Sequence, residues 1–146
     1  MSHFRKQTRD ALVTALTGLT TTGSNIFKAK ASDFEPAQIP GLNLMTSADE
    51  WDPEVSAPEY DARDLAVEIE IVVKKEDGLE DLIDQIEVEV FDAITGDAPL
   101  AALVKRMKLI SSELEVSDDQ ERKTGKRVLT WACNLYHDSD DLESLA

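Results

Sequence analysis

The segment LAVEIEIVV at residues 65–73 contains the clearest strand pattern in the chain. Every second side chain is apolar, and the side chains between them are mostly charged or small. The apolar series is Leu65, Val67, Ile69, Ile71 and Val73. Because successive side chains of a strand point to opposite faces, this pattern predicts a half-buried strand. The apolar face of its sheet must then be covered by a second layer.

Two amphipathic helices are predicted to supply that cover. The first spans about residues 3–19, where apolar residues recur at helical spacing. In the second, Asp77 with Glu80 three residues later fits a capping box, and Gly96 ends the helix. The apolar face of this second helix consists of Leu79, Leu82, Ile83, Ile86, Val90, Ala93 and Ile94.

Four further strands and one short helix complete the expected order. Pro99 opens the short helix, which covers residues 100–104. The strands are expected at residues 26–29, 41–46, 107–116 and 126–136, with a polar turn between the last two. The chain shows no repeat and no alternation of strands with helices. It therefore predicts an α+β fold, a mostly antiparallel sheet with two amphipathic helices on one face.

Residues 47–64 differ in kind from the rest and predict a long acidic loop. Seven acids stand against Arg63 alone, and two prolines preclude a regular helix. Trp51 and Tyr60 are the large apolar groups in it, so we expect them, with Asp49 and Glu50 beside them, to contact another protein. A reading in which both aromatic rings fold back onto their own domain stays open.

Length and charge indicate a single acidic domain. The chain has 146 residues, which fits one domain, and we expect that domain at residues 1–136 with an acidic mobile tail at 137–146. The net charge is −15, and residues 1–30 carry five basic groups and one acid. A body this acidic repels phosphate, which argues against specific binding of nucleic acid, and solubility alone also explains the charge.

The sequence offers little that would carry catalysis or bind a metal. His3, His137 and Cys133 have no ligand spacing, and the acids at 138–143 lack the glycine and spacing of a calcium loop. There is no phosphate-binding glycine loop and no nucleophile elbow. We therefore expect no catalytic residues, no metal site and no cofactor. Apolar runs are too short for a membrane span, no signal peptide is expected, and the single cysteine fits a reducing compartment.

In its order of elements the chain resembles the tail terminator proteins of long-tailed bacteriophages, of the lambda minor tail protein U type. The resemblance covers about residues 4–136 and depends on order and spacing rather than on a rare motif. Its points are ALVTAL at 11–16, IF at 26–27, IPGL at 39–42, the acidic segment, the strand at 65–73, GLEDLI at 78–83, FDAI at 91–94 and the last two strands.

The resemblance implies a structural virion protein at the head-proximal end of the tail, assembled in the host cytoplasm. It implies a hexameric ring that binds the tail tube protein, ends tube polymerisation and presents a surface for head-tail joining to the head connector or completion protein. DNA would pass through without specific binding, and no catalysis or membrane is involved. Divalent cations such as magnesium would assist assembly by bridging carboxylates. Acids that could face the pore are Glu68, Glu70, Glu87 and Glu89.

Three alternatives stay open beside this reading. Another oligomeric tail or neck protein, such as a tail tube subunit or a head-completion protein, would also use a small α+β domain. An acidic inhibitor that mimics DNA would instead bind a basic partner as a monomer or dimer. An enzyme is the least expected, since no catalytic constellation stands out.

Overall fold

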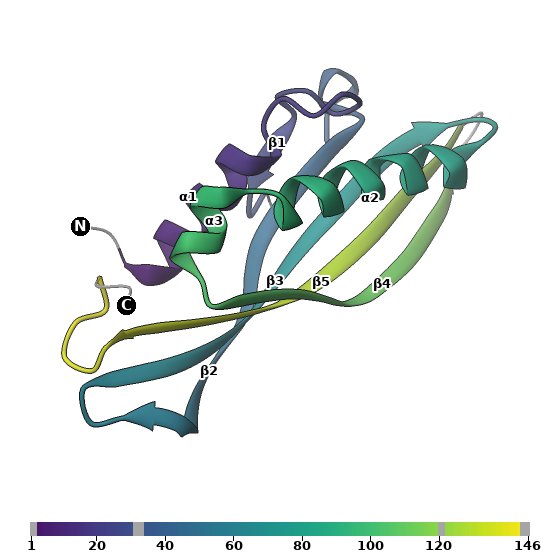
Figure 1. Ribbon diagram of the computed structural model, residues 1–146. Coiled ribbons are helices and arrows are strands. Elements are labelled where there is room, and N and C mark those ends of the chain that lie inside the picture. The colour runs from purple at the N-terminus through teal and green to yellow at the C-terminus, as the bar shows by residue number, and fades with distance from the viewer. Residues whose placement is uncertain (1–2, 31–33, 120–121, 144–146) are drawn as a thin grey trace.

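The computed structural model describes residues 3–30, 34–119 and 122–143 as a five-stranded sheet with helices on one face (Figure 1). The strand order is β1-β2-β3-β5-β4, with β1 parallel to β2 and all other neighbours antiparallel. The strands are β1 Ile26–Lys28, β2 Gly41–Ala57, β3 Tyr60–Lys75, β4 Arg106–Asp119 and β5 Arg122–Asp138. The helices are α1 Phe4–Leu16, the 3-10 helix η1 Pro36–Gln38, α2 Leu79–Thr95 and α3 Ala98–Leu103. This confirms the predicted α+β fold class.

The core lies between the helices and the apolar side of β3 and β5. All five residues of the alternating apolar series at 65–73 are buried, as the alternation predicts. Trp131 on β5 is fully buried next to them, and Ile83, Ile86 and Val90 of α2 pack down from above. The central strand of the sheet is therefore the one whose pattern is clearest in the sequence.

The start of α2 is capped differently from the sequence prediction. Its N-cap is Gly78, with φ of 72°, and no side chain accepts a hydrogen bond there, so the capping box of Asp77 and Glu80 is wrong. The chain turns sharply from β3 into α2, and a left-handed backbone at this turn suits glycine. A Cβ at Gly125 of β5 would lie 2.8 Å from Leu79 Cδ2, so Gly125 lets the first turn of α2 approach the sheet closely.

Helix α1 ends at Leu16 rather than near residue 19, because Thr17 has extended backbone angles. Its buried side is Phe4, Thr8, Leu12 and Leu16. On its exposed side Asp10 accepts hydrogen bonds from Lys6 and from Lys28 of β1, which ties the helix to the sheet edge. These two bonds lower the pKa of the Asp10 carboxyl.

The predicted acidic loop at residues 47–64 is wrong, because these residues extend β2 and β3 into a hairpin. We call residues 49–64 the arm; Asp49 pairs with Leu65 at its base, and Ala57 pairs with Tyr60 beside the turn. The register is irregular between Asp52 and Ala57, and Pro53, which has no N–H to donate, lies in that interval. The arm has no apolar alternation. Its β2 side pairs with β3, and residues 60–64 of β3 pair also with β5. Backbone pairing of this kind leaves no periodicity in the sequence.

Regular structure continues past the expected boundary at Tyr136. His137 and Asp138 belong to β5, and His137 is buried. Beyond them the chain turns back to α1, where the amide of Phe4 donates to the carbonyl of Leu142 at 2.8 Å. Residues 137–143 thus lie against the first helix and the arm rather than leaving the domain, and residues 144–146 are outside the described part.

Within the described residues, the second face of the sheet carries no helix (Figure 1). The register puts Glu68 and Glu70 of β3 on this face, opposite Thr130 and Val128 of β5. The side chains there are partly exposed and mostly polar or small. Half-polar antiparallel sheets commonly leave one face in contact with water or with a partner.

Candidate interface sites

The arm presents one exposed aromatic side chain. Trp51 of β2 is 52% exposed, and Glu50 next to it is also exposed. Tyr60, in contrast, packs against Tyr136 of β5 with ring centroids 5.0 Å apart. Of the two aromatic residues predicted as partner contacts, Trp51 is therefore free to contact a partner, whereas Tyr60 already has a neighbour in its own protomer.

Asp49 is engaged inside the protomer, unlike the exposed acid expected from the sequence. Its Oδ2 lies 2.5 Å from Nη1 of Arg5 on α1, and its Oδ1 lies 3.7 Å from Nη1 of Arg63 on β3. The side chain is only 13% exposed. Two cations from different elements thus hold Asp49 at the base of the arm, where it joins α1 to the hairpin.

A buried histidine continues this cluster. His137 is 1% exposed, stacks on Phe4 at 4.9 Å, and accepts a hydrogen bond from Arg63 Nε at 3.1 Å through its Nε2. Its Nδ1 lies 2.7 Å from the Asp138 carbonyl, which can only accept, so Nδ1 is the donor in this contact. The arm, α1 and the end of β5 therefore meet at one polar cluster.

The four acids predicted as pore-facing lie on three different surfaces. Glu68 and Glu70 are on the uncovered face of the sheet. On α2, Glu87 accepts a hydrogen bond from Ser112 of β4 at 2.8 Å, and Glu89 accepts two from Thr21 on the other flank of the helix. Glu89 therefore holds Thr21 in the segment after α1. Of the four acids, only Glu68 and Glu70 share a face.

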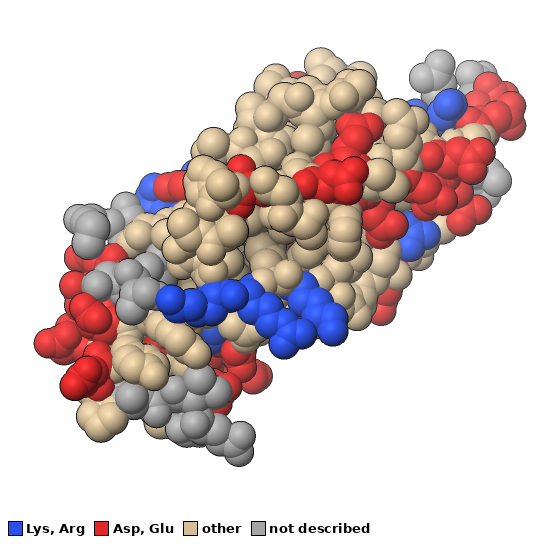
Figure 2. All heavy atoms as spheres, in the orientation of Figure 1, with Lys and Arg blue, Asp and Glu red and all other residues tan. Residues whose placement is uncertain are grey.

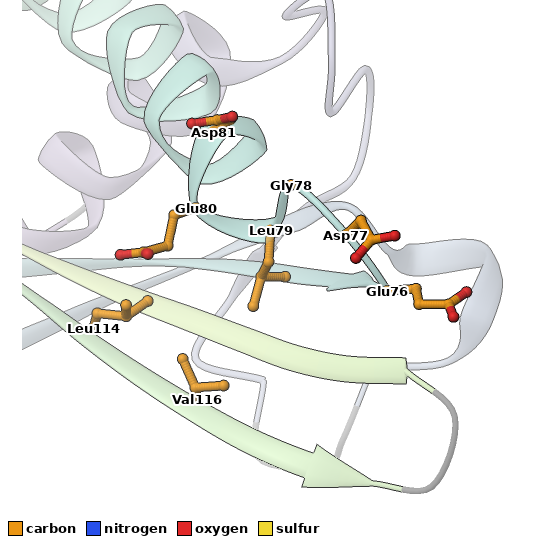
Figure 3. Close-up of a pocket in the computed structure, with 8 residues that line it drawn as sticks. All are labelled: Glu76, Asp77, Gly78, Leu79, Glu80, Asp81, Leu114 and Val116. Carbon is orange, nitrogen blue, oxygen red and sulfur yellow. The ribbon is translucent and has the colours of Figure 1, made fainter.

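A hollow of about 450 Å³ opens between the first turn of α2 and β4 (Figure 3). Leu79, Leu114 and Val116 point into it and form an apolar floor, and Val116 is 50% exposed. We call it the acidic hollow, since four of the residues that line it are acidic. Its lining residues are Glu76, Asp77, Gly78, Leu79, Glu80, Asp81, Leu114 and Val116.

At the opposite end of β4 the surface is basic. Figure 2 shows a band of Lys and Arg along the start of β4, below acids that spread over α2. We call this band the basic edge; its exposed members are Lys105, Arg106 and Lys108. Lys105 lies over the ring of Tyr136 at 5.6 Å. Ile110, 58% exposed, follows directly in the same strand.

Neither the hollow nor the basic edge was predicted from the sequence. The acids at 76–81 stood out only as parts of a helix start, and Lys105, Arg106 and Lys108 are three cations in a chain that holds fifteen. Ile110 and Val116 beside the two clusters are exposed, and the sequence alone does not show this.

Other chemistry is sparse in the part of the chain that the structure describes. Residues 3–30, 34–119 and 122–143 hold no group of three His, Cys, Asp or Glu side chains arranged for a metal ion. Cys133 is fully buried in the core, where burial raises the pKa of its thiol to about 12. Each helix in those ranges is too short or too polar to cross a bilayer.

Comparison of the chain with protein-family models and with curated proteins finds no match. The function proposed below therefore depends on this chain's own residues and on the resemblance in the order of its elements.

Proposed function

We propose that this protein is a structural virion protein, the terminator of a long-tailed phage tail, which forms a ring on the head-proximal end of the tail tube. The observation that carries the proposal is the arm with exposed Trp51, joined to a small α+β domain. Such a hairpin offers a surface to a neighbouring subunit, and an exposed tryptophan is a frequent anchor of protein contacts.

The architecture also suits a ring on physical grounds. A closed ring needs two different surfaces on each subunit that meet at every contact. This chain has an open sheet face, a long edge strand in β4 and a projecting arm, each with a different charge pattern. A net charge of −15 on each copy further suits a particle through which DNA slides, since phosphate binds where cations gather.

In this proposal the chain binds copies of itself, the tail tube protein and the head connector or completion protein. It ends tube polymerisation and supports head-tail joining, with six copies in the ring, no cofactor and no catalytic step. A tail tube subunit or head-completion protein is the second candidate. Figure 1 gives its reason: the extended hairpin and open edge strands would equally allow a subunit to stack into tubes.

The test uses the full chain and purified tail tubes. The terminator function predicts a discrete ring of about six copies by native mass spectrometry, and in electron micrographs a cap at one end of each tube. Trp51→Ala should keep the circular dichroism of the parent and lower ring or cap formation at least about tenfold, since a central tryptophan contributes over about 2 kcal/mol to association.

Val88→Ala is the matched control, because Val88 is 59% exposed on α2, far from the arm in sequence and on another element. Long tubes formed by the chain alone would favour the tube subunit. A monomer that binds basic DNA-binding proteins and no tube end would favour the DNA mimic, and loss of the fold in Trp51→Ala would mean that Trp51 packs on its own domain.

Salt and magnesium provide a second test of the same proposal. Bringing several copies of net charge −15 together costs electrostatic energy, which screening over about 8 Å at physiological salt reduces. The ring fraction should therefore rise from low to moderate salt and rise again with magnesium. A ring fraction that does not change over both series would count against charge-limited assembly, while leaving the tube cap to be judged separately.

A further inference from the structure

We propose that copies of this chain associate head to tail, with the basic edge of one copy docked into the acidic hollow of the next. The inference names the contact surfaces of the ring, and it therefore rests on the proposed function. It is argued from the chemistry of the two surfaces and from their places on β4 (Figures 2 and 3).

The acidic hollow has the composition of a docking site for a cation beside an apolar side chain. Four acidic residues line it together with an apolar floor, and Val116 in that floor is half exposed. One cation, Lys75, reaches the rim beside Gly78. The acids on the rim outnumber this lysine, so the hollow keeps a negative potential that attracts a basic group.

The basic edge has the matching composition. Neither Arg106 nor Lys108 forms an ion pair within the part of the chain that the structure describes. Ile110 beside them is 58% exposed and would fit against the apolar floor of a hollow. Two cations flanked by an aliphatic group on one copy thus correspond to four acids around Leu114 and Val116 on another.

The basic edge and the acidic hollow of one copy cannot contact each other. Arg106 pairs with Asn134 near one end of β5, whereas Val116 pairs with Gly125 near the other. At about 3.3 Å per residue these positions are roughly 30 Å apart along a paired strand. The attraction between them can be satisfied only between copies.

The arrangement favours docking of side chains over pairing of two β4 edges. A two-fold contact of β4 with β4 would also bring the two surfaces together, but it would end at a dimer. The β4 strand has a register shift between Leu109 and Ser111 and carries Lys108, features that oppose edge-to-edge pairing. Docking between unlike surfaces instead leaves one basic edge and one acidic hollow free on each pair of copies. Further copies can then add until the ring closes.

The experiment uses two charge-reversed variants of the full chain. One is Arg106→Glu with Lys108→Glu, and the other is Glu76→Lys with Glu80→Lys. The first variant places two new acids against the acidic hollow. The second offsets Asp77 and Asp81 with two lysines and so removes the net charge of the four acids. Each variant alone therefore loses the charge attraction at every contact, and its self-association constant should fall at least about tenfold. In an equal mixture the new acids of one variant meet the new lysines of the other at one kind of contact, and the original basic edge meets the original hollow at the other kind. The mixture should therefore recover species of more than two copies by native mass spectrometry.

Matched controls reverse exposed charges that are outside both surfaces: Lys74→Glu on β3 and Asp92→Lys on α2. They should assemble as the parent does. If the lysine variant of the hollow fails to fold, Glu76→Gln with Glu80→Gln removes the charge without reversing it and should still weaken assembly.

Four outcomes would overturn the inference. Reversed variants that assemble and cap tubes like the parent would overturn it and leave the proposed function standing. A mixture that stops at two copies would mean a two-fold contact. If Arg106→Glu with Lys108→Glu lost binding to duplex DNA without a change in assembled mass, the basic edge would be a binding surface for DNA phosphates and not for a second copy. A parent chain that is monomeric in solution and at tube ends would overturn both proposals.

Discussion

The two halves of β3 are held in place by different forces. Residues 65–73 lie beneath α2 with their apolar side chains buried, whereas residues 60–64 lie in the arm among charged partners. In the first half, Ile69 and Ile71 contribute through the area that they remove from water. In the second half, Arg63 donates to His137 and pairs with Asp49. One continuous strand thus has an apolar half and a polar half.

This difference explains why the sequence predicted a strand at residues 65–73 but a loop at residues 60–64. Hydrophobic burial imposes a period of two on the residues themselves. A polar cluster imposes no period, because it needs only that partners meet in space, and Arg5, Asp49 and His137 are far apart along the chain. The two halves should also respond differently to substitution.

The largest effect is expected in the apolar half. Trp131→Ala removes a fully buried side chain of β5 that packs in the core, and it should lower the free energy of unfolding by about 3–5 kcal/mol. Urea unfolding followed by circular dichroism measures this. Val88→Ala, at an exposed position of α2 outside both contact surfaces, is the control and should change stability by less than about 0.5 kcal/mol. A loss of under about 1 kcal/mol for Trp131→Ala would mean that the core is not centred on β5.

A smaller loss is expected at the base of the arm. Arg63→Ala leaves the buried Nε2 of His137 without its donor and removes one cation from Asp49, which should cost about 1–3 kcal/mol. Arg63→Lys keeps the charge but lacks the planar guanidinium, so its stability should lie between those of the parent and Arg63→Ala. Hydrogen exchange should show faster exchange in residues 49–64 and little change beneath α2. Equal exchange in both halves would contradict the division of β3.

The smallest effect is a pH dependence at the start of α1. Burial lowers the pKa of His3 below its ordinary value of 6.5, and the charge of Arg5 lowers it further. The unfolded chain therefore binds this proton more tightly, so the contribution of His3 to stability is complete above about pH 6.5 and is lost as the pH falls below it.

His3→Asn tests this dependence. Asparagine keeps an acceptor at the N-cap, where the His3 ring now accepts from the amide of Arg5, but it does not titrate. Urea midpoints at pH 5 and pH 7.5 should differ less for the variant than for the parent. Equal pH differences in both proteins would show that His3 does not contribute.

Much of the fold could be predicted, and the candidate sites much less. The α+β class, the strand at 65–73 and the helix at 79–94 follow from periodicity that the residues carry themselves, and Pro99 correctly marked the short helix. The candidate contact residues have different environments. Trp51 is exposed on the arm, whereas Asp49 is engaged by Arg5 and Arg63, so a shared stretch of sequence did not give these residues a shared environment.

The sequence by itself determined the strand pattern, the two amphipathic helices and the charge of −15, because each is a property of neighbouring residues. Only the tertiary structure decided that the acidic segment is a hairpin, that His137 is buried, and that Leu114 and Val116 line a hollow edged by the acids before and within α2. The physical reason is that backbone pairing, burial and electrostatic attraction act between residues that are close in space. Those distances are set by the way the sheet and helices pack, and local periodicity does not contain them.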